Sequence, residues 1–158
     1  MGKTHIIARA IIMDNDHMLA CVGKKKNQNK RTHLFLPGGH VEHKEPIKDA
    51  LIRELEEELG MKSSIVRFLG VEEYSFDSED SSKCHLHELN FYFEVSVPGL
   101  SSAIIPKSPE DHTEFVWITP EDLEGSTFYP NGLKPILQHW LQADYEKAFR
   151  SHIVMKGK

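Results

Sequence analysis

Three glutamates in one short segment have the spacing of metal-binding carboxylates. Glu54, Glu57 and Glu58 stand in the relation i, i+3 and i+4, which places their side chains on one side of a helix. Like charges at this spacing destabilise a helix by about 0.2–0.5 kcal/mol per pair, and Arg53 alone is too little to neutralise three of them. Clustered carboxylate oxygens suit a hard divalent cation such as Mg²⁺, whose coordination shell phosphates can complete. The alternative is a solvated acidic helix face, the commoner explanation for a bare run of glutamates.

A helix after a glycine loop must position these carboxylates. Glu45-Pro46 predicts the start of that helix, because proline is tolerated at the first helical position, and Gly60 predicts its end. One side of the predicted helix is apolar and should pack on a core; its residues are Ile47, Leu51, Ile52, Leu55 and Leu59. The preceding Pro37-Gly38-Gly39 can bring backbone close to a ligand or metal, because glycine has no Cβ.

The whole segment from Gly39 to Met61 fits a longer pattern. It reads Gly, five residues, Glu, seven residues, then Arg-Glu-aliphatic-any-Glu-Glu-any-Gly-aliphatic, and the matching positions are Gly39, Glu45, Arg53, Glu54, Leu55, Glu57, Glu58, Gly60 and Met61. For average residue usage such a match has a chance probability on the order of 10⁻⁸. The segment resembles the Nudix box, the signature of the Nudix hydrolase superfamily, and the chain is similar to its MutT-like members.

The resemblance implies a fold, a metal and a reaction. The fold would be the α/β Nudix fold, an α/β/α sandwich with a mixed sheet between helices. Mg²⁺, with Mn²⁺ as a substitute, would bind Glu54, Glu57, Glu58 and the carbonyl of Gly38. The reaction would be hydrolysis of the pyrophosphate linkage in a nucleoside diphosphate linked to another moiety, which releases a nucleoside monophosphate. Arg53 and Glu45 would form an ion pair that orients the loop and the helix.

The resemblance leaves the general base open. Some family members use a glutamate of the box and others use a glutamate from a later loop. Glu114, three residues before Trp117, is the later candidate, although it is equally well explained as an ordinary polar strand residue. Glu88 is a weaker alternative, and Glu42 is a candidate supporting partner.

The sequence does not single out the substrate. Markers of coenzyme A, ADP-ribose and dinucleoside polyphosphate enzymes are not convincingly present. A nucleoside triphosphate is slightly favoured over a nucleotide sugar of the ADP-ribose type, because the chain is short and shows no additional N-terminal domain. A non-catalytic nucleotide-binding sensor is the alternative from another functional class, but the three acidic positions are all kept, which favours catalysis. Phe35, Tyr74 and Tyr92 could stack on a base or belong to the core.

The rest of the chain predicts strands and a final helix. Residues 5–13 and 18–22 predict a hairpin, and further strands are expected at 34–36, 89–97 and 114–118. Residues 64–76 predict one long strand or a bent pair of strands. Gly70 marks a candidate bulge, and the alternation in 89–97 predicts a half-buried strand. A short helix should begin near Thr119, and a final helix should run from Asn131 to about Phe149.

Composition limits the setting and the partners. The 158 residues are expected to form one domain, residues 1–158. A net charge of −5 makes nucleic acid an improbable partner, so an RNA-processing role is disfavoured. The basic segment 24–31 is either a solvated loop or a flap for an anionic substrate. Two distant cysteines, no long apolar run and no signal-peptide pattern predict a cytoplasmic protein outside the membrane. The oligomeric state, including a homodimer, stays open.

Overall fold

A computed structural model describes residues 4–24, 31–75, 87–119, 122, 127–130 and 133–151. Residues 25–30 of the basic segment lie outside this part of the chain. The described elements are β1 (Thr4–Ile11), β2 (Met13–Asp14), β3 (His17–Lys24), β4 (Arg31–Phe35), β5 (Gly38–His40), α1 (Ile47–Leu59), β6 (Ser64–Ser75), β7 (His87–Ser96), β8 (Phe115–Ile118), β9 (Phe128–Tyr129), α3 (Leu133–Leu141), η1 (Tyr145–Lys147) and β10 (Phe149–Ser151).

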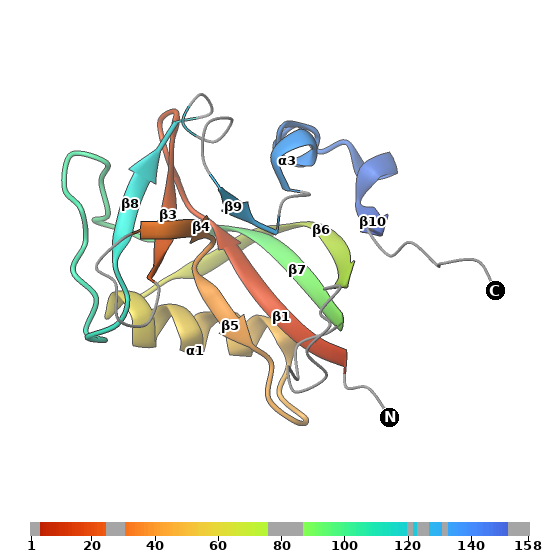
Figure 1. Cartoon of the computed structure of the whole chain (residues 1–158), viewed down its shortest axis with the longest axis horizontal. Coiled ribbons are helices and arrows are strands. Elements are labelled where there is room, and N and C mark those ends of the chain that lie inside the picture. The colour runs from red at the N-terminus through yellow and green to blue at the C-terminus, as the bar shows by residue number, and fades with distance from the viewer. Residues whose placement is uncertain are drawn as a thin grey trace.

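The described strands form two five-stranded sheets. The first sheet has the order β10-β6-β7-β1-β5 and is mixed, because β1 runs parallel to β7 and antiparallel to β5. The second sheet has the order β2-β3-β4-β9, with β8 paired to β3. Figure 1 shows α1 and α3 on opposite sides of the first sheet. The predicted α/β class with helices around a mixed sheet is therefore confirmed, with the strands divided between two sheets.

Each side of the first sheet has its own core. On one side Leu51 and Leu55 of α1 pack with Phe93 of β7. On the other side Trp140 of α3 packs with Tyr92 of β7, and their ring centroids are 4.9 Å apart. Residues on the two faces of β7 thus pack with different helices, Phe93 with α1 and Tyr92 with α3.

Helix α1 forms where the sequence predicts it. Pro46 is its N-cap, with φ −64° and an extended ψ of 136°, and Gly60 ends it in the left-handed conformation with φ 64°. The Gly60 N–H donates to the Glu56 carbonyl at 2.9 Å. The buried side of the helix includes Glu58 among its apolar residues, which places one acidic side chain at the edge of the core.

The predicted hairpin of residues 5–13 and 18–22 is only partly correct. β2 and β3 form a short antiparallel hairpin around Asn15, which has φ 54°. β1 does not pair with β3; it pairs with β5 and β7 instead. Ala8 and Ile11 have no exposed surface, so β1 is an interior strand that needs a neighbour on each side.

The prediction that 89–97 is half buried is only partly correct. Ser96 is exposed, but Asn90 and Tyr92 on the same face are 0% exposed, and Tyr92 packs against Trp140 of α3. The bulge predicted at Gly70 is confirmed by a register shift between Phe68 and Gly70. The Trp140 indole lies directly against Gly70 and occupies the place of a Cβ. The missing side chain therefore lets α3 dock on β6.

The final helix is shorter than predicted. α3 ends at Leu141, because Ala143 adopts φ 59° and turns the chain into η1 and β10. The Ala143 N–H donates to the Trp140 carbonyl at 3.0 Å and the Asp144 N–H donates to the His139 carbonyl at 2.9 Å, which is the Schellman pattern of helix ends.

The short helix expected near Thr119 lies mostly outside the described residues. Its capping contact is present, because the Thr119 N–H donates to Asp122 Oδ2 at 2.9 Å. No helix in the described part of the chain has the length and hydropathy needed to cross a membrane.

Candidate active site

The predicted glycine loop is only partly a loop, because Gly38 and Gly39 begin strand β5. This segment, Pro37 to Gly39, is called the glycine loop below, and it lies directly against the acidic side of α1. The Gly38 N–H donates to Glu58 Oε2 at 2.8 Å. The carboxylate of Glu54 occupies the space that a Cβ on Gly39 would need. Two of the three predicted acidic residues therefore meet the backbone of the predicted loop, as close approach without a Cβ allows.

Arg53 ties the loop to the helix. Its Nε and Nη2 donate to the two oxygens of Glu45 at 2.8 and 3.0 Å, which is a bidentate ion pair. Nη2 also donates to the His40 carbonyl at 3.1 Å. The hydrogen bonds that Glu45 accepts from Arg53, and then from the Glu42 N–H, lower its pKa to about 2. The orienting ion pair predicted between Arg53 and Glu45 is therefore present in the structure.

Arg53 also holds two of the acidic residues on its own helix. Nη1 donates to Glu54 Oε1 at 2.8 Å and lies 3.4 Å from Glu57 Oε2. The Glu57 side chain is 50% exposed, so this second contact is weak. Glu57 is thereby the box carboxylate most open to solvent and to a ligand.

Glu58 differs from its neighbours in burial. The residue is only 8% exposed, and desolvation raises the pKa of its carboxyl to about 7. The hydrogen bond from Gly38 and the charge of Arg9 act in the opposite direction, while the charges of Glu54 and Glu110 raise the pKa further. A carboxyl with such a pKa exists in both protonation states near neutral pH.

Glu110 is an acidic residue of this site that no motif in the sequence marks. It lies in a loop docked on the end of α1: Ser108 Oγ donates to the Glu58 carbonyl at 2.6 Å, and the Glu110 N–H donates to Ser108 Oγ at 3.0 Å. Thr113 Oγ1 donates to Glu110 Oε2 at 2.8 Å. A loop rich in Pro and Ser has no periodicity to signal such docking, so only the fold brings Glu110 near Glu58.

The other predicted acids have contacts of their own. Glu114 is exposed, and its carbonyl accepts from the Val22 N–H at 2.8 Å; its role as a base stays a prediction. Glu88 accepts from Asn90 Nδ2 at 3.4 Å, and both alternate with Phe91 and Phe93 on β7, so they lie on the side away from α1. Glu42 contacts Glu45 through its backbone N–H, at 2.9 Å.

The donor set fits a hard divalent cation by its chemistry. Glu54, Glu57 and Glu58 supply carboxylate oxygens, and the Gly38 carbonyl adds a neutral oxygen. Within the described residues no three His, Cys, Asp or Glu side chains converge closely enough to hold an ion as they stand. Arg53 holds Glu54 and Gly38 holds Glu58, so an ion would have to compete with these contacts.

Comparison with known proteins now identifies the family. The family model of the NUDIX domain matches residues 3–140. The chain belongs to the NUDIX domain family. The match includes the glycine loop, α1 and the Glu110 loop, and it ends before η1 and β10.

Two curated relatives share about a third of their aligned residues with this chain. It is 38% identical over 80 residues to the low-salt glycan biosynthesis protein Agl8 of Haloferax volcanii, which covers 48% of this chain and 49% of that protein. It is 32% identical over 84 residues to the ADP-ribose pyrophosphatase of Methanocaldococcus jannaschii, which covers 53% of this chain and 47% of that protein. The chain thus spans about half the length of the curated relatives it matches.

A solved MutT structure has a similar fold. The MutT protein from Methanosarcina mazei Go1 superimposes with a TM-score of 0.66 at 19% identity, over 90% of this chain and 96% of that chain. This likeness extends to nearly the whole chain and supports the fold assignment.

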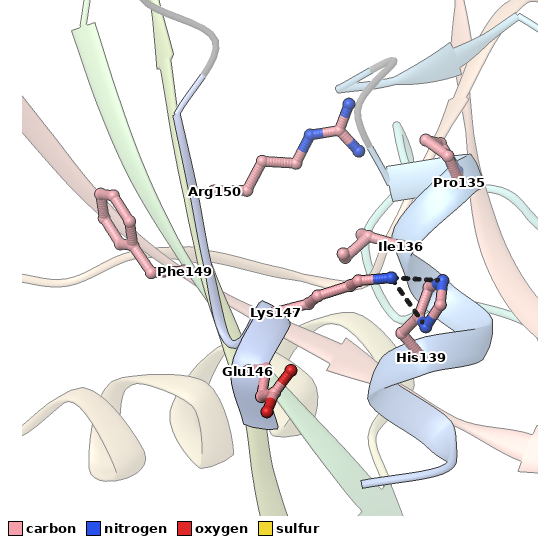
Figure 2. A pocket seen from close by; sticks show the side chains of 7 residues that line it. All are labelled: Pro135, Ile136, His139, Glu146, Lys147, Phe149 and Arg150. Carbon is pink, nitrogen blue, oxygen red and sulfur yellow. Dashed lines mark hydrogen bonds between the residues drawn. The ribbon is translucent and has the colours of Figure 1, made fainter. Parts of the chain in front are cut away.

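A separate cavity lies beside β10, at the edge of the first sheet opposite to β5. Its volume is about 320 Å³, and Figure 2 shows its lining from α3, η1 and β10. The lining residues are Pro135, Ile136, His139, Glu146, Lys147, Phe149 and Arg150. Lys147 Nζ lies 3.2 Å from His139 Nε2. β10 and β5 are opposite edges of the first sheet, so this cavity is apart from the acidic site.

Proposed function

We propose that this NUDIX protein is a divalent-metal-dependent pyrophosphohydrolase. It would hydrolyse the pyrophosphate linkage of a nucleoside diphosphate joined to another moiety and release a nucleoside monophosphate. The observation that carries the proposal is the placement of Glu54 and Glu58 against Gly39 and Gly38, with Glu57 beside them and open to solvent. This arrangement puts hard oxygen donors where a charged diphosphate and its counter-ion could both bind.

The chain's residues have distinct roles in this proposal. Glu54, Glu57 and Glu58, with the Gly38 carbonyl, would hold Mg²⁺ or Mn²⁺, which when bound neutralises phosphate charge and lowers the pKa of a coordinated water. Arg53 keeps the glycine loop and α1 in register through Glu45. The general base is a glutamate of the box, Glu114, or Glu110, which the structure adds as a candidate through its effect on Glu58.

A nucleoside triphosphate is the first substrate candidate, as the sequence analysis favours. A nucleotide sugar is the second, because the Methanocaldococcus jannaschii relative is an ADP-ribose pyrophosphatase. We place the reaction in the cytoplasm, where the buried free thiol of Cys21 would stay reduced.

A turnover panel tests the proposal. Purified protein is assayed against nucleoside triphosphates, nucleotide sugars, dinucleoside polyphosphates and coenzyme A, with Mg²⁺, with Mn²⁺ and with EDTA. Glu57→Gln is compared with Glu56→Gln, an exposed neighbour on the other side of α1. We expect metal-dependent turnover that falls about 100-fold in Glu57→Gln and is unchanged in Glu56→Gln.

Two outcomes would contradict this function. Equal turnover in both variants would remove Glu57 from the reaction. No turnover by folded wild-type protein, together with nucleotide-induced thermal stabilisation in EDTA, would instead support the non-catalytic sensor.

A further inference from the structure

Arg9 lies beside the glycine loop on the interior strand of the first sheet. In register it pairs with Gly38 of β5 on one side and Tyr92 of β7 on the other. Its neighbours Ala8 and Ala10 point into the core under α1, so the Arg9 side chain starts from the other face of β1. The guanidinium is half-buried and lies 5.8 Å from the centre of the Phe35 ring.

Arg9 uses one nitrogen to hold the loop. Nη1 donates to the carbonyls of Leu36 and Gly38 at 3.0 and 2.9 Å. Within the described residues no group accepts a hydrogen bond from Nε or Nη2. A guanidinium has five N–H donors in a planar fork, so most of its donor capacity is unused in a position fixed by two hydrogen bonds and a ring.

The glycine loop connects Arg9 to the acidic site, because Arg9 Nη1 binds the Gly38 carbonyl and the Gly38 N–H binds Glu58. The Gly38 carbonyl that Arg9 binds is one of the oxygens proposed to hold the cation. The positive charge also reaches the carboxyl of Glu58, whose pKa it lowers against the effect of burial. No carboxylate among the described residues forms an ion pair with Arg9, unlike Arg53 and Arg67. An anion that binds beside Gly38 therefore meets a guanidinium without a bound counter-ion.

We propose that Arg9 binds a phosphate group of the substrate through Nε and Nη2, while Nη1 keeps the loop in place. The proposal rests on the pyrophosphohydrolase function above, and it assigns a phosphate-binding residue outside the acidic helix. A guanidinium matches two phosphate oxygens in a fork, with shorter and stronger hydrogen bonds than neutral groups make.

The competing explanation is a structural one, in which Arg9 only supports the loop. In that case substitution would lower stability and leave phosphate binding intact in protein that is still folded. The two explanations therefore differ in ligand affinity, measured without metal so that the cation site does not contribute.

The test uses inorganic pyrophosphate as the probe in EDTA. Isothermal titration compares wild type with Arg9→Gln and Arg9→Lys, and Arg150→Gln on the opposite edge of the sheet serves as the matched loss of one charge. We expect Arg9→Gln to weaken pyrophosphate binding about 10- to 100-fold. Arg9→Lys should keep part of the affinity because it retains charge without the fork, and Arg150→Gln should bind like wild type.

A second measurement uses only the wild-type protein, so it does not depend on whether a variant folds. The Nε–Hε resonance of Arg9 is followed by NMR in the wild-type protein and should shift as pyrophosphate is added. An unmoved resonance at saturating pyrophosphate, or wild-type affinity in folded Arg9→Gln, overturns the assignment. If wild type still hydrolyses nucleotides in that case, the hydrolase function stands; if it neither hydrolyses nucleotides nor binds pyrophosphate, the proposed function fails and the Arg9 proposal fails with it.

Discussion

Gly39 determines how closely the glycine loop approaches the acidic side of α1. The Glu54 carboxylate lies where a Cβ on Gly39 would be. Glu54 is also fixed by Arg53 Nη1 at 2.8 Å, so it is held on two sides. Because Gly39 has no side chain, the Glu54 carboxylate can take this position against the backbone.

Gly39→Ala should displace Glu54 without unfolding the protein. The group that must move is the end of a flexible side chain, which can rotate away, and φ at Gly39 is not positive. We expect affinity for Mn²⁺, followed by electron paramagnetic resonance, to fall about 10-fold or more. The thermal midpoint should change little.

A double substitution separates this steric cause from any other. In the Glu54→Gln variant, adding Gly39→Ala should lower the affinity for Mn²⁺ much less than Gly39→Ala does in wild type. Both changes act on the same metal ligand, so their effects should not add. Full additivity of the two effects would show that the methyl group acts elsewhere.

At the scale of elements, local signals predicted α1 and could not predict the end of α3. The start and end of α1 follow from Pro46 and Gly60, and its apolar side follows from the helical period. α3 ends because Ala143 is left-handed at φ 59°, a conformation that glycine usually provides. An alanine there carries no stop signal, so the apolar pattern predicts a helix as far as Phe149, which in the structure begins β10.

Local signals in the sequence could not predict the strand pairing either. The residues of β1 and β7 predicted strands, but their neighbours in the sheets depend on contacts far apart in sequence. The alternation assigns Tyr92 to solvent, because Trp140 of α3, which packs against it, lies 48 residues later in the chain. The sequence could place the box residues of the active site on a helix beside a loop. It could not assign Glu110 to this site, because Glu110 lies in a loop without a recognisable pattern.

Ala143→Gly should stabilise the protein. An alanine in the left-handed region costs about 1–2 kcal/mol relative to its preferred conformations, and glycine does not carry this cost; the greater freedom of glycine in the unfolded chain offsets part of the gain. We expect a net gain of about 0.5–1 kcal/mol in the free energy of unfolding, measured by urea denaturation. Ala103→Gly, at an exposed turn residue without positive φ, is the control and should not stabilise. A loss of stability in Ala143→Gly would mean that the Ala143 methyl group contributes packing that outweighs its backbone strain.

At the scale of the whole molecule, the site is assembled from three separate segments. Gly38 in β5 supplies the N–H for Glu58, α1 supplies the carboxylates, and Ser108 fastens a distant loop over the same glutamate. Glu58, whose pKa burial raises, lies where these three segments meet. The sequence could assign Glu58 to the acidic set, but its environment is a property of the complete fold.

This burial makes the global stability of the metal-free protein depend on pH. The Glu58 pKa is about 7 in the folded state against an ordinary value of 4.5, so between these pH values the folded protein binds more protons than the unfolded chain. The free energy of unfolding should therefore fall as pH rises from about 4.5 to 7, by up to roughly 3 kcal/mol from this group. Glu58→Gln should remove this component, because its amide oxygen still accepts from Gly38 and carries no charge.

Urea denaturation in EDTA at several pH values between 4.5 and 7.5 measures this dependence. Other groups also titrate, so the quantity to follow is the difference between Glu58→Gln and wild type, which should grow in favour of the variant as pH rises. Glu56→Gln, on the exposed side of the same helix, should leave the pH dependence as it is in wild type. With saturating Mg²⁺ at neutral pH, wild type should instead be more stable than Glu58→Gln. An ion that binds only the folded state stabilises it by mass action, and this ion needs the charged form of Glu58. A constant difference across the pH range in EDTA would show that Glu58 keeps an ordinary pKa and is not desolvated in the folded protein.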